Sequence, residues 1–451
     1  MFGGYLLKKD FHTAIVGSNY LSLILAIDLI KNGKDVLVLD DDRMDLGELF
    51  GTDLGLLELM FLKSWGQERH IDALINIEDL ISERPYTILG DNSWLSLGHR
   101  PSENVYEFSR RFALPLSSLD DDFDQNWIQF VSKVSQAYFR YGGFQQITPD
   151  KLMVYAPPSI KELYEQFKIF IATPRDWSSE SLLSTLMSYY SKRIDVLSDE
   201  GDIFFFFVAL FSPRYLLKQD VLVEQLLTAY KELDGYFKQT RMREWLFHKQ
   251  KPWSIELASY EGIIHPKQLT FIGAFPTGMP LGLNPLVDHY VILEATSPVE
   301  AQYTSLKSYG LMIVTSEKSI GTESPFWFIE YQDNKIVVRL LYPASKGMKL
   351  EFLKAESLRR LSKKLPLIDP RLQDEVFDWS LNLTSEVFVH VKSVKSSTVN
   401  THSMLKLGLF DSSSPGITQK LKNVDYFGPF RAPKMGLFSS MVDLTIETQF
   451  K

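Results

Sequence analysis

The feature that most constrains the fold is a pair of apolar runs joined by a short polar turn and a helical pattern, within residues 13–40. The first run ends at Val16, and the turn that follows reads Gly17-Ser18-Asn19-Tyr20-Leu21-Ser22. An apolar helical pattern comes next, and Val36-Leu-Val-Leu-Asp40 closes the unit. A strand, a tight turn, a helix and a strand with an acid at its tip are typical of a dinucleotide-binding βαβ unit.

The chemistry of diphosphate binding explains this pattern. The amino end of a helix offers unpaired N–H groups and a partial positive charge to an anion. Gly17 occupies the first glycine position of the usual motif, and the small Ser22 occupies the third. Asp40 is the acid expected to bind the ribose hydroxyls. Asn19 replaces the second glycine, and we expect its side chain to lie where a diphosphate oxygen would sit.

Two interpretations of this unit remain open. Asparagine tolerates left-handed backbone geometry, so we expect the turn at Asn19 to persist without a glycine. The unit would then bind a diphosphate through the backbone of residues 18–22. Alternatively, it is an ordinary βαβ unit that holds no cofactor, because motif matches of this kind include false positives.

Composition excludes several function classes. The chain has 451 residues, is 45% apolar and carries a formal net charge of −8 without long blocks of one sign. Such a charge distribution argues against nucleic-acid binding. The absence of cysteine excludes disulfides, thiolate metal sites and a cysteine nucleophile. No membrane span or leader is recognised, because the densest apolar run, Ile203–Phe211, is too short for a bilayer. We expect a cytoplasmic protein.

The remaining chain is expected to divide into a helical part and a β-rich part. Residues 100–245 favour helices, with a short strand at 241–245, and a hairpin is expected between 254–258 and 268–272. Helices are expected at 160–169, 181–190 and 220–233. Antiparallel strands are expected at 290–294, 311–315, 326–331, 336–341 and 386–391. The tail from 424 to 448 is expected to hold a short strand, a Gly-Pro break and a final helix.

Several further segments resemble one family of proteins. Gly47 and Asp53-Leu-Gly55 follow Asp40, Val221–Phe237 ends in a glycine turn, and Asp425-Tyr-Phe-Gly-Pro-Phe430 precedes Met435-Gly-Leu-Phe-Ser-Ser440. In this order they resemble the flavin amine oxidase and phytoene desaturase superfamily, which also contains the Rab GDP dissociation inhibitors. Three positions depart from that pattern. Leu46 and Glu48 replace a glycine and an arginine, and Pro429 replaces an aspartate.

The resemblance implies an α/β fold in which a Rossmann-like FAD- or NAD(P)-binding domain is interleaved with a mixed helical and antiparallel-sheet substrate domain. The first would comprise residues 1–60, 220–280 and 405–451, and the second residues 60–220 and 280–405. The motif and the resemblance together imply FAD as the cofactor, held by Gly17, Ser18, Asn19, Tyr20, Leu21, Ser22, Asp40, Asp41, Gly47, Gly428, Met435, Gly436 and Leu437.

Two functions are compatible with these residues. The first is an FAD-dependent oxidoreductase acting on a hydrophobic or amine-bearing small molecule. The second is a cofactor-free pseudoenzyme that binds a lipid, a peptide or a protein partner between its domains, as the departures at Asn19, Leu46 and Pro429 suggest. No catalytic side chain is identified, and the eight histidines show no metal-binding spacing.

Two other features favour structural roles. The run Phe204–Phe207 is expected to pack in a core, with the lining of a greasy tunnel as the alternative. The acidic stretch Asp120-Asp121-Asp122-Phe-Asp124 lacks the glycine and the final glutamate of a calcium loop, so we expect a solvated helix start.

Overall fold

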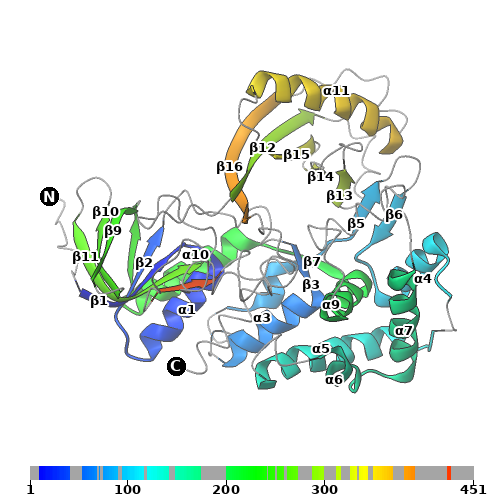
Figure 1. Ribbon diagram of the computed structural model, residues 1–451, viewed down its shortest axis with the longest axis horizontal. Coiled ribbons are helices and arrows are strands. Elements are labelled where there is room, and N and C mark those ends of the chain that lie inside the picture. The colour runs from blue at the N-terminus through cyan, green and yellow to red at the C-terminus, as the bar shows by residue number, and fades with distance from the viewer. Residues whose placement is uncertain are drawn as a thin grey trace.

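The computed structural model describes most of the N-terminal half of the chain and separate segments of the rest (Figure 1). The described residues are 10–40, 53–68, 71, 75–89, 94–115, 119–141, 148–173, 200–240, 242–248, 251–257, 262–272, 287–298, 311–315, 326–332, 335–343, 349–368, 380–391 and 424–427. They form three sheets, two groups of helices and one further helix outside these groups.

The first sheet contains a five-stranded parallel core in the order β8-β2-β1-β11-β17. Its strands are β1 (Asp10–Val16), β2 (Val36–Asp40), β8 (Tyr236–Gln239), β11 (Ile263–Ile272) and β17 (Val424–Phe427). Thr13 pairs with Val36 of β2 and with Gln268 of β11, so β1 lies at the centre. The inner residues of β1 and β2 are fully buried, as expected for parallel strands covered on both faces.

An antiparallel extension continues this sheet beyond β11. Strands β9 (Met242–His248) and β10 (Lys251–Leu257) form a hairpin, and β10 pairs with the first residues of β11. Ile255 faces Ile264 in that second pair. A hairpin is present here, but β10 pairs with residues 263–264 and not with the expected 268–272, which pair with β1 and β17. β11 is one long strand that pairs with β10 through its first residues and with β1 and β17 through later ones. The alternation of apolar and polar residues in the sequence could not indicate this double pairing.

Helices α1 (Tyr20–Lys31) and α10 (Gln219–Glu232) pack against each other beside this sheet (Figure 1). α1 ends at Asn32 and Gly33, where Lys34 N donates to Leu29 O at 3.0 Å, as the expected Asn-Gly cap requires. The helix and glycine turn expected over 221–237 are present as α10 and the Asp234-Gly235 connection, and β8 begins with the last two residues of that segment. The expected strand at 241–245 is instead part of β9.

Gly235 connects α10 to β8 because a side chain there would strike a buried ring. A Cβ atom on Gly235 would lie 2.5 Å from the ring of Tyr230. Tyr230 is fully buried, and its hydroxyl lies 2.9 Å from Val36 O and 3.1 Å from Tyr236 O. The same side chain therefore joins the helix to both β2 and β8.

The second sheet has the order β16-β12-β15-β14-β13-β5-β6 and curves around the upper part of the molecule in Figure 1. Its strands are β5 (Tyr86–Leu89), β6 (Trp94–Leu97), β12 (Val287–Pro298), β13 (Leu311–Thr315), β14 (Phe326–Gln332), β15 (Lys335–Pro343) and β16 (Ser380–Val391). The five strands expected between 290 and 391 are all present. All neighbours are antiparallel except β13 and β5, which pair in parallel and bring an early segment into the sheet. Helix α11 (Leu350–Ile368) lies between β15 and β16 in the chain.

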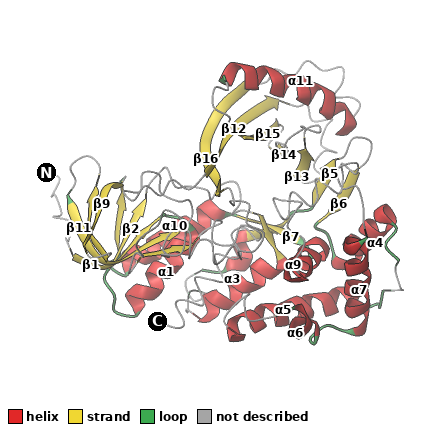
Figure 2. Ribbon diagram, viewed as in Figure 1, coloured by secondary structure: helices red, strands yellow, loops and turns green. Residues whose placement is uncertain are grey.

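The helices of residues 56–211 gather in a second group (Figure 2). They are α3 (Leu56–Glu68), α4 (Pro101–Phe112), α5 (Phe123–Tyr141), α6 (Pro149–Met153), α7 (Pro158–Ala172) and α9 (Glu200–Phe211), with the short 3-10 helix η2 (Ile77–Leu80). A small sheet of β3 (Asp53–Gly55), β7 (Arg214–Leu217) and β4 (Ile81–Glu83) lies beside them. The expected helix at 181–190 and the final helix of the tail lie outside the described residues.

Helix α9 forms the centre of this group. Phe204, Phe207 and Phe211 are fully buried. Phe207 lies 5.3 Å from Trp127 and 5.5 Å from Phe167, measured between ring centroids. Tilted and edge-on ring pairs at these distances are the favourable arrangements. The prediction of a core segment is consistent with this packing, because the described neighbours of these rings are other apolar side chains.

Candidate functional site

The carboxyl ends of β1, β2 and β11 meet at one edge of the first sheet. The strand order reverses at β1, since the chain continues to β2 and β8 on one side and to β11 and β17 on the other. In open sheets of this kind, ligands bind outside the carboxyl ends of the strands at the reversal point. The residues after β1 and at the ends of β2 and β11 therefore define the candidate site.

Gly17 is the first residue of this site and tolerates no side chain. Its φ is +119°, and a Cβ atom would collide with the carbonyl oxygen of Ile272 at the end of β11. Its backbone N–H donates to Leu39 O of β2 at 2.9 Å. The glycine expected at the tight turn thus holds three strand ends close together.

Asn19 is the N-cap of α1 and bridges the reversal point of the sheet. Its Oδ1 accepts the backbone N–H of Ser22 and the Ser22 hydroxyl, both at 3.1 Å. Its Nδ2 donates to Ile272 O at 3.1 Å, across 253 positions of the chain. The carboxamide therefore satisfies one of the helix amides that a diphosphate would use.

The conformation of Asn19 differs from the expectation. Its φ and ψ are −71° and 169°, an extended geometry, and no left-handed residue is needed at this position. Gly17 alone adopts positive φ in the turn. The capping geometry explains the difference, because an N-cap residue takes an extended backbone so that its side chain reaches the third helical amide.

The acid expected at the tip of β2 is present and hydrogen-bonded. The Ser18 hydroxyl donates to Asp40 Oδ1 at 2.6 Å, and both residues are half-buried. Asp40 O also accepts the backbone N–H of Thr240 at 3.0 Å, next to the end of β8. Ser18 and Asp40 are thus brought together at the site, and one carboxylate oxygen already has a donor.

The first helical residues contribute backbone groups to the site rather than side chains. Tyr20 and Leu21 are almost completely buried, and within the described part of the chain their backbone N–H groups have no acceptor. Burial of the Tyr20 hydroxyl, with a smaller contribution from Glu58, raises the pKa of Tyr20 well above its usual range. Tyr20 therefore stays neutral and belongs to the core. The fully buried Ser22 packs its hydroxyl near Gly17.

The other predicted site residues lie outside the described residues. They are Asp41, Gly47, Gly428, Met435, Gly436 and Leu437, together with the substituted positions Leu46, Glu48 and Pro429. The Ile272 carbonyl was missed by sequence reasoning. Nothing in a sequence marks a backbone carbonyl that becomes a neighbour only when β11 pairs with β1.

The acidic stretch 120–124 continues into the first turn of α5 and includes a side chain that binds the start of α4. Asp124 Oδ1 accepts the backbone N–H of Ser102 in the first turn of α4 at 2.7 Å. Among the described residues, no three histidine, aspartate or glutamate side chains gather closely enough to hold a metal ion. In the same part of the chain, no helix combines the length and apolar character needed to cross a membrane.

No protein-family model matches the chain, and no curated protein matches it by sequence. Solved structures with a similar arrangement include Rab GDI from Plasmodium falciparum, at 10% identity over 98% of both chains and a TM-score of 0.47. A geranylgeranyl bacteriochlorophyll reductase-like protein from Thermoplasma acidophilum gives 10% identity, covers 98% of this chain and 77% of its own, and has a TM-score of 0.47. A tryptophan C-6 flavin-dependent halogenase from taromycin biosynthesis gives 10% identity, 98% and 72% coverage, and a TM-score of 0.45.

Because these identities and TM-scores are low, the fold class is assigned from the strand order and strand registers of this chain itself. A parallel sheet ordered β8-β2-β1-β11-β17, with a glycine turn after β1 and an acid at the end of β2, is a Rossmann-like α/β fold. The predicted fold class is confirmed. The second sheet and the helix group around α9 supply the mixed helical and largely antiparallel part.

Proposed function

We propose that this protein binds FAD or a related dinucleotide at the carboxyl edge of its parallel sheet and oxidises a hydrophobic or amine-bearing small molecule. One observation carries this proposal. Gly17, Asp40 and the free backbone N–H groups of Tyr20 and Leu21 converge where the strand order reverses. This is the arrangement that receives a diphosphate at a helix N-terminus and a ribose at the next strand.

In this proposal, the backbone of residues 18–22 holds the diphosphate and Asp40 holds the adenosine ribose. Asp41 and Gly47 would follow the ribose, and Gly428 and Met435–Leu437 would lie toward the flavin end. Bound FAD would supply hydride chemistry, and the protein would orient the substrate and exclude water. We also propose the two interleaved domains expected from the sequence, with residues 1–60, 220–280 and 405–451 forming the dinucleotide-binding one.

A second candidate function is favoured by the hydrogen bonds of Asn19. Its carboxamide already caps α1 and ties the helix to Ile272 O, so no free ligand is needed to satisfy these groups. On this basis the protein would be a cofactor-free pseudoenzyme that binds a lipid, a peptide or a protein partner. The two candidates differ in whether FAD binds.

Purified full-length protein titrated with FAD separates the two candidates. A ligand that binds only the folded state must stabilise it, by about 2.7 kcal/mol at 100 times its Kd. Binding predicts a flavin absorbance that stays with the protein and a melting temperature that rises with FAD concentration. A colourless protein whose melting temperature FAD does not change would reject the oxidoreductase and support the cofactor-free function.

The variant Asn19→Gly tests the role of the capping side chain. We expect tighter FAD binding, because the substitution frees the Ser22 amide and removes the carboxamide from the diphosphate position. Glycine is itself an acceptable N-cap, so the loss of helix stability should be only a few tenths of a kcal/mol. FAD affinity is measured by fluorescence titration of wild type and variant.

Asn76→Gly is the matched control. Asn76 caps η2 in the same way, accepting the Glu78 N–H at 3.3 Å, but it lies outside the site. It should leave FAD affinity unchanged. Equal FAD affinity for Asn19→Gly and wild type would show that the Asn19 side chain does not obstruct the diphosphate.

A further inference from the structure

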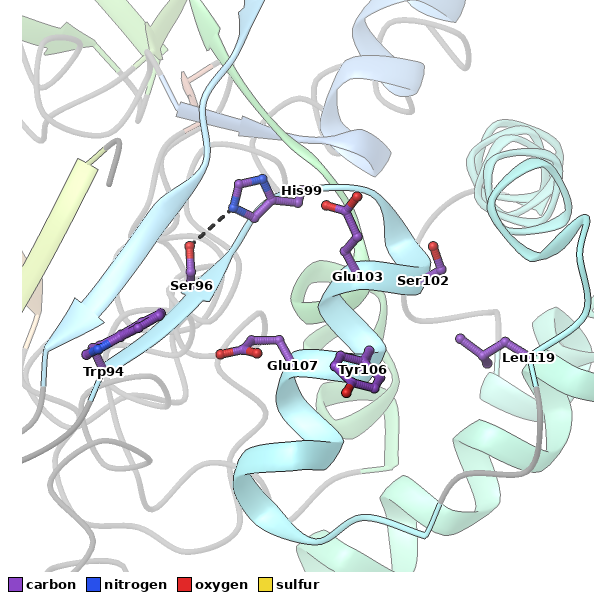
Figure 3. A pocket seen from close by; sticks show the side chains of 8 residues that line it. All are labelled: Trp94, Ser96, His99, Ser102, Glu103, Tyr106, Glu107 and Leu119. Atoms are coloured by element: carbon purple, nitrogen blue, oxygen red, sulfur yellow. Dashed lines mark hydrogen bonds between the residues drawn. The ribbon is translucent and has the colours of Figure 1, made fainter. Parts of the chain in front are cut away.

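A pocket of about 550 Å³ opens between β6 and the first turns of α4 (Figure 3). Its volume falls within the range of small-molecule sites. None of its lining residues belongs to the β1–α1 turn or to the ends of β2 and β11. Six of the lining side chains carry the argument: Trp94, Ser96, His99, Glu103, Tyr106 and Glu107.

The walls of this pocket include two aromatic rings in contact with water. Trp94 is 49% exposed and Tyr106 is 63% exposed, although both are large side chains that gain free energy on burial. Trp127, Phe108 and Phe167 are buried in the neighbouring helix group. The face of an exposed tryptophan or tyrosine attracts an organic cation through the negative charge of its π system.

Two carboxylates line the same pocket. Glu103 and Glu107 lie one turn apart on α4, a spacing at which like charges repel each other. Glu107 is paired with Arg110, at 2.7 Å to Nη2 and 3.0 Å to Nε. Glu103 has no hydrogen-bond or ion-pair partner within the described ranges. Figure 3 shows the Glu107 carboxylate pointing toward the side of the pocket that carries Trp94 and Ser96.

Helix stability alone explains only part of this arrangement. An acid in the first turn of a helix interacts favourably with the helix dipole, and Glu103 occupies such a position. The second carboxylate, Glu107, is held by its ion pair with Arg110, but neither interaction accounts for the two exposed rings. Exposed aromatic faces beside a carboxylate that lacks a cationic partner, as Glu103 does in the described part of the chain, are features that recognise a positively charged organic group.

The rim of the pocket is held rigidly by a buried side chain. Asn104 is fully buried, accepts the His99 N–H at 3.1 Å and donates to His99 O at 3.0 Å. Ser96 Oγ lies 3.2 Å from His99 Nε2, so the polar groups between β6 and α4 are already positioned. A pocket with such fixed polar groups loses little entropy when a small ligand binds.

We propose that this pocket binds a small molecule carrying an alkylammonium group, with the cation against Trp94 or Tyr106 and near Glu103 and Glu107. The proposal does not depend on dinucleotide binding, because the pocket is formed by other residues. The ligand class is defined by charge and shape: a cation small enough for the pocket, with apolar groups around its nitrogen.

Calorimetric titration of the full-length protein tests this proposal. The probes are choline, tetramethylammonium and butylammonium, each with chloride as counterion. The neutral control is 3,3-dimethylbutan-1-ol, which has the shape of choline without its charge. We expect at least one cation to bind and choline to bind more tightly than its neutral analogue. No binding of any of the three cations, or equal binding of choline and the alcohol, would overturn the proposal.

Variants locate the binding site. Trp94→Leu should weaken binding by about 2- to 30-fold, the range expected for a cation–π contact. Glu103→Gln should weaken it by about 2- to 5-fold, because exposed charge pairs contribute little each. Glu103 is on the surface, so this variant should fold even if the Trp94 variant does not.

Glu165→Gln on α7, which removes an exposed carboxylate elsewhere, is the control and should leave binding unchanged. A cation that binds all four proteins equally is bound elsewhere, and the proposal would be wrong.

Discussion

The carboxamide of Asn19 makes three hydrogen bonds, and the three partner groups lie at different places in the site. The Ser22 amide belongs to the helix, the Ser22 hydroxyl to its packing face, and Ile272 O to the strand across the reversal point. The sequence predicted that this residue would interfere with a diphosphate. The bond to Ile272 could not be predicted, because it depends on a strand pairing far along the chain.

The surroundings of the His12 side chain make the stability of the protein depend on pH. Burial, aided by Lys34 and Lys267 and opposed by Asp35, lowers the pKa of His12 below its usual value. The unfolded chain therefore binds a proton more readily than the folded protein as pH falls below about 6.5. The stability that neutral His12 contributes is fully present above that pH and is lost as pH falls through the folded pKa.

We expect His12→Asn, which keeps a polar atom near the Thr13 hydroxyl, to reduce the loss of stability on acidification from about pH 7 to pH 5. Urea unfolding at several pH values measures this. Lys267→Gln serves as a comparison and should reduce the loss only in part, because burial is the larger cause. Parallel pH profiles for wild type and His12→Asn would contradict the assignment.

At the scale of elements, the connection from α10 to β8 depends on close packing. The sequence indicated a helix followed by a glycine turn at Asp234-Gly235. In the structure the residue with positive φ is Asp234, at 60°, while Gly235 leaves room for Tyr230. The position of β8 was missed because its four residues are largely exposed and lack strong alternation. Pairing with β2, rather than intrinsic preference, makes this segment a strand.

Two glycine substitutions should have opposite effects on stability. Gly235→Ala places a methyl group against the Tyr230 ring, which its hydrogen bonds to two strands prevent from moving freely. We expect a loss of about 1–3 kcal/mol in the free energy of unfolding. Gly66→Ala in α3 meets only Ile77 Cδ1 at 3.7 Å, an ordinary contact, and should gain about 0.5–1 kcal/mol. Urea denaturation compares both with wild type, and similar shifts for the two variants would refute the packing argument.

At the scale of the whole molecule, one ion pair joins two sheets. Arg84 follows β4 of the small sheet, and Glu330 belongs to β14 of the second sheet. Their side chains are only 13% and 10% exposed. Arg84 is held further by its backbone N–H, which donates to Arg214 O of β7 at 2.9 Å. Residues 246 positions apart are thus brought together in a setting of low polarity.

Arg84→Met should therefore be strongly destabilising, by about 3–5 kcal/mol, because it removes the cation that faces the buried Glu330 carboxylate. The double variant Arg84→Met/Glu330→Leu should recover much of that loss, since the buried carboxylate is removed as well. Thermal and urea unfolding provide the measurement.

Arg359→Met removes an exposed arginine paired with Glu356 on α11 and should cost at most about 1 kcal/mol. A small effect of Arg84→Met, equal to that of Arg359→Met, would contradict the role given to the buried pair.

The local sequence was sufficient to predict the βαβ unit, its glycine turn, the acid at the tip of β2, the Asn32-Gly33 helix end and the later strands. These features depend on periodicity and on the backbone preferences of neighbouring residues, which short segments contain. Three others arose from contacts between distant segments: the double pairing of β11, the parallel pairing of β13 with β5 and the Asn19–Ile272 hydrogen bond. The pocket between β6 and α4 is of the same kind, because its charges and rings converge only when strand and helix pack together. Such contacts are set by the three-dimensional arrangement of the chain, where hydrogen bonding and burial act between residues that no local pattern connects.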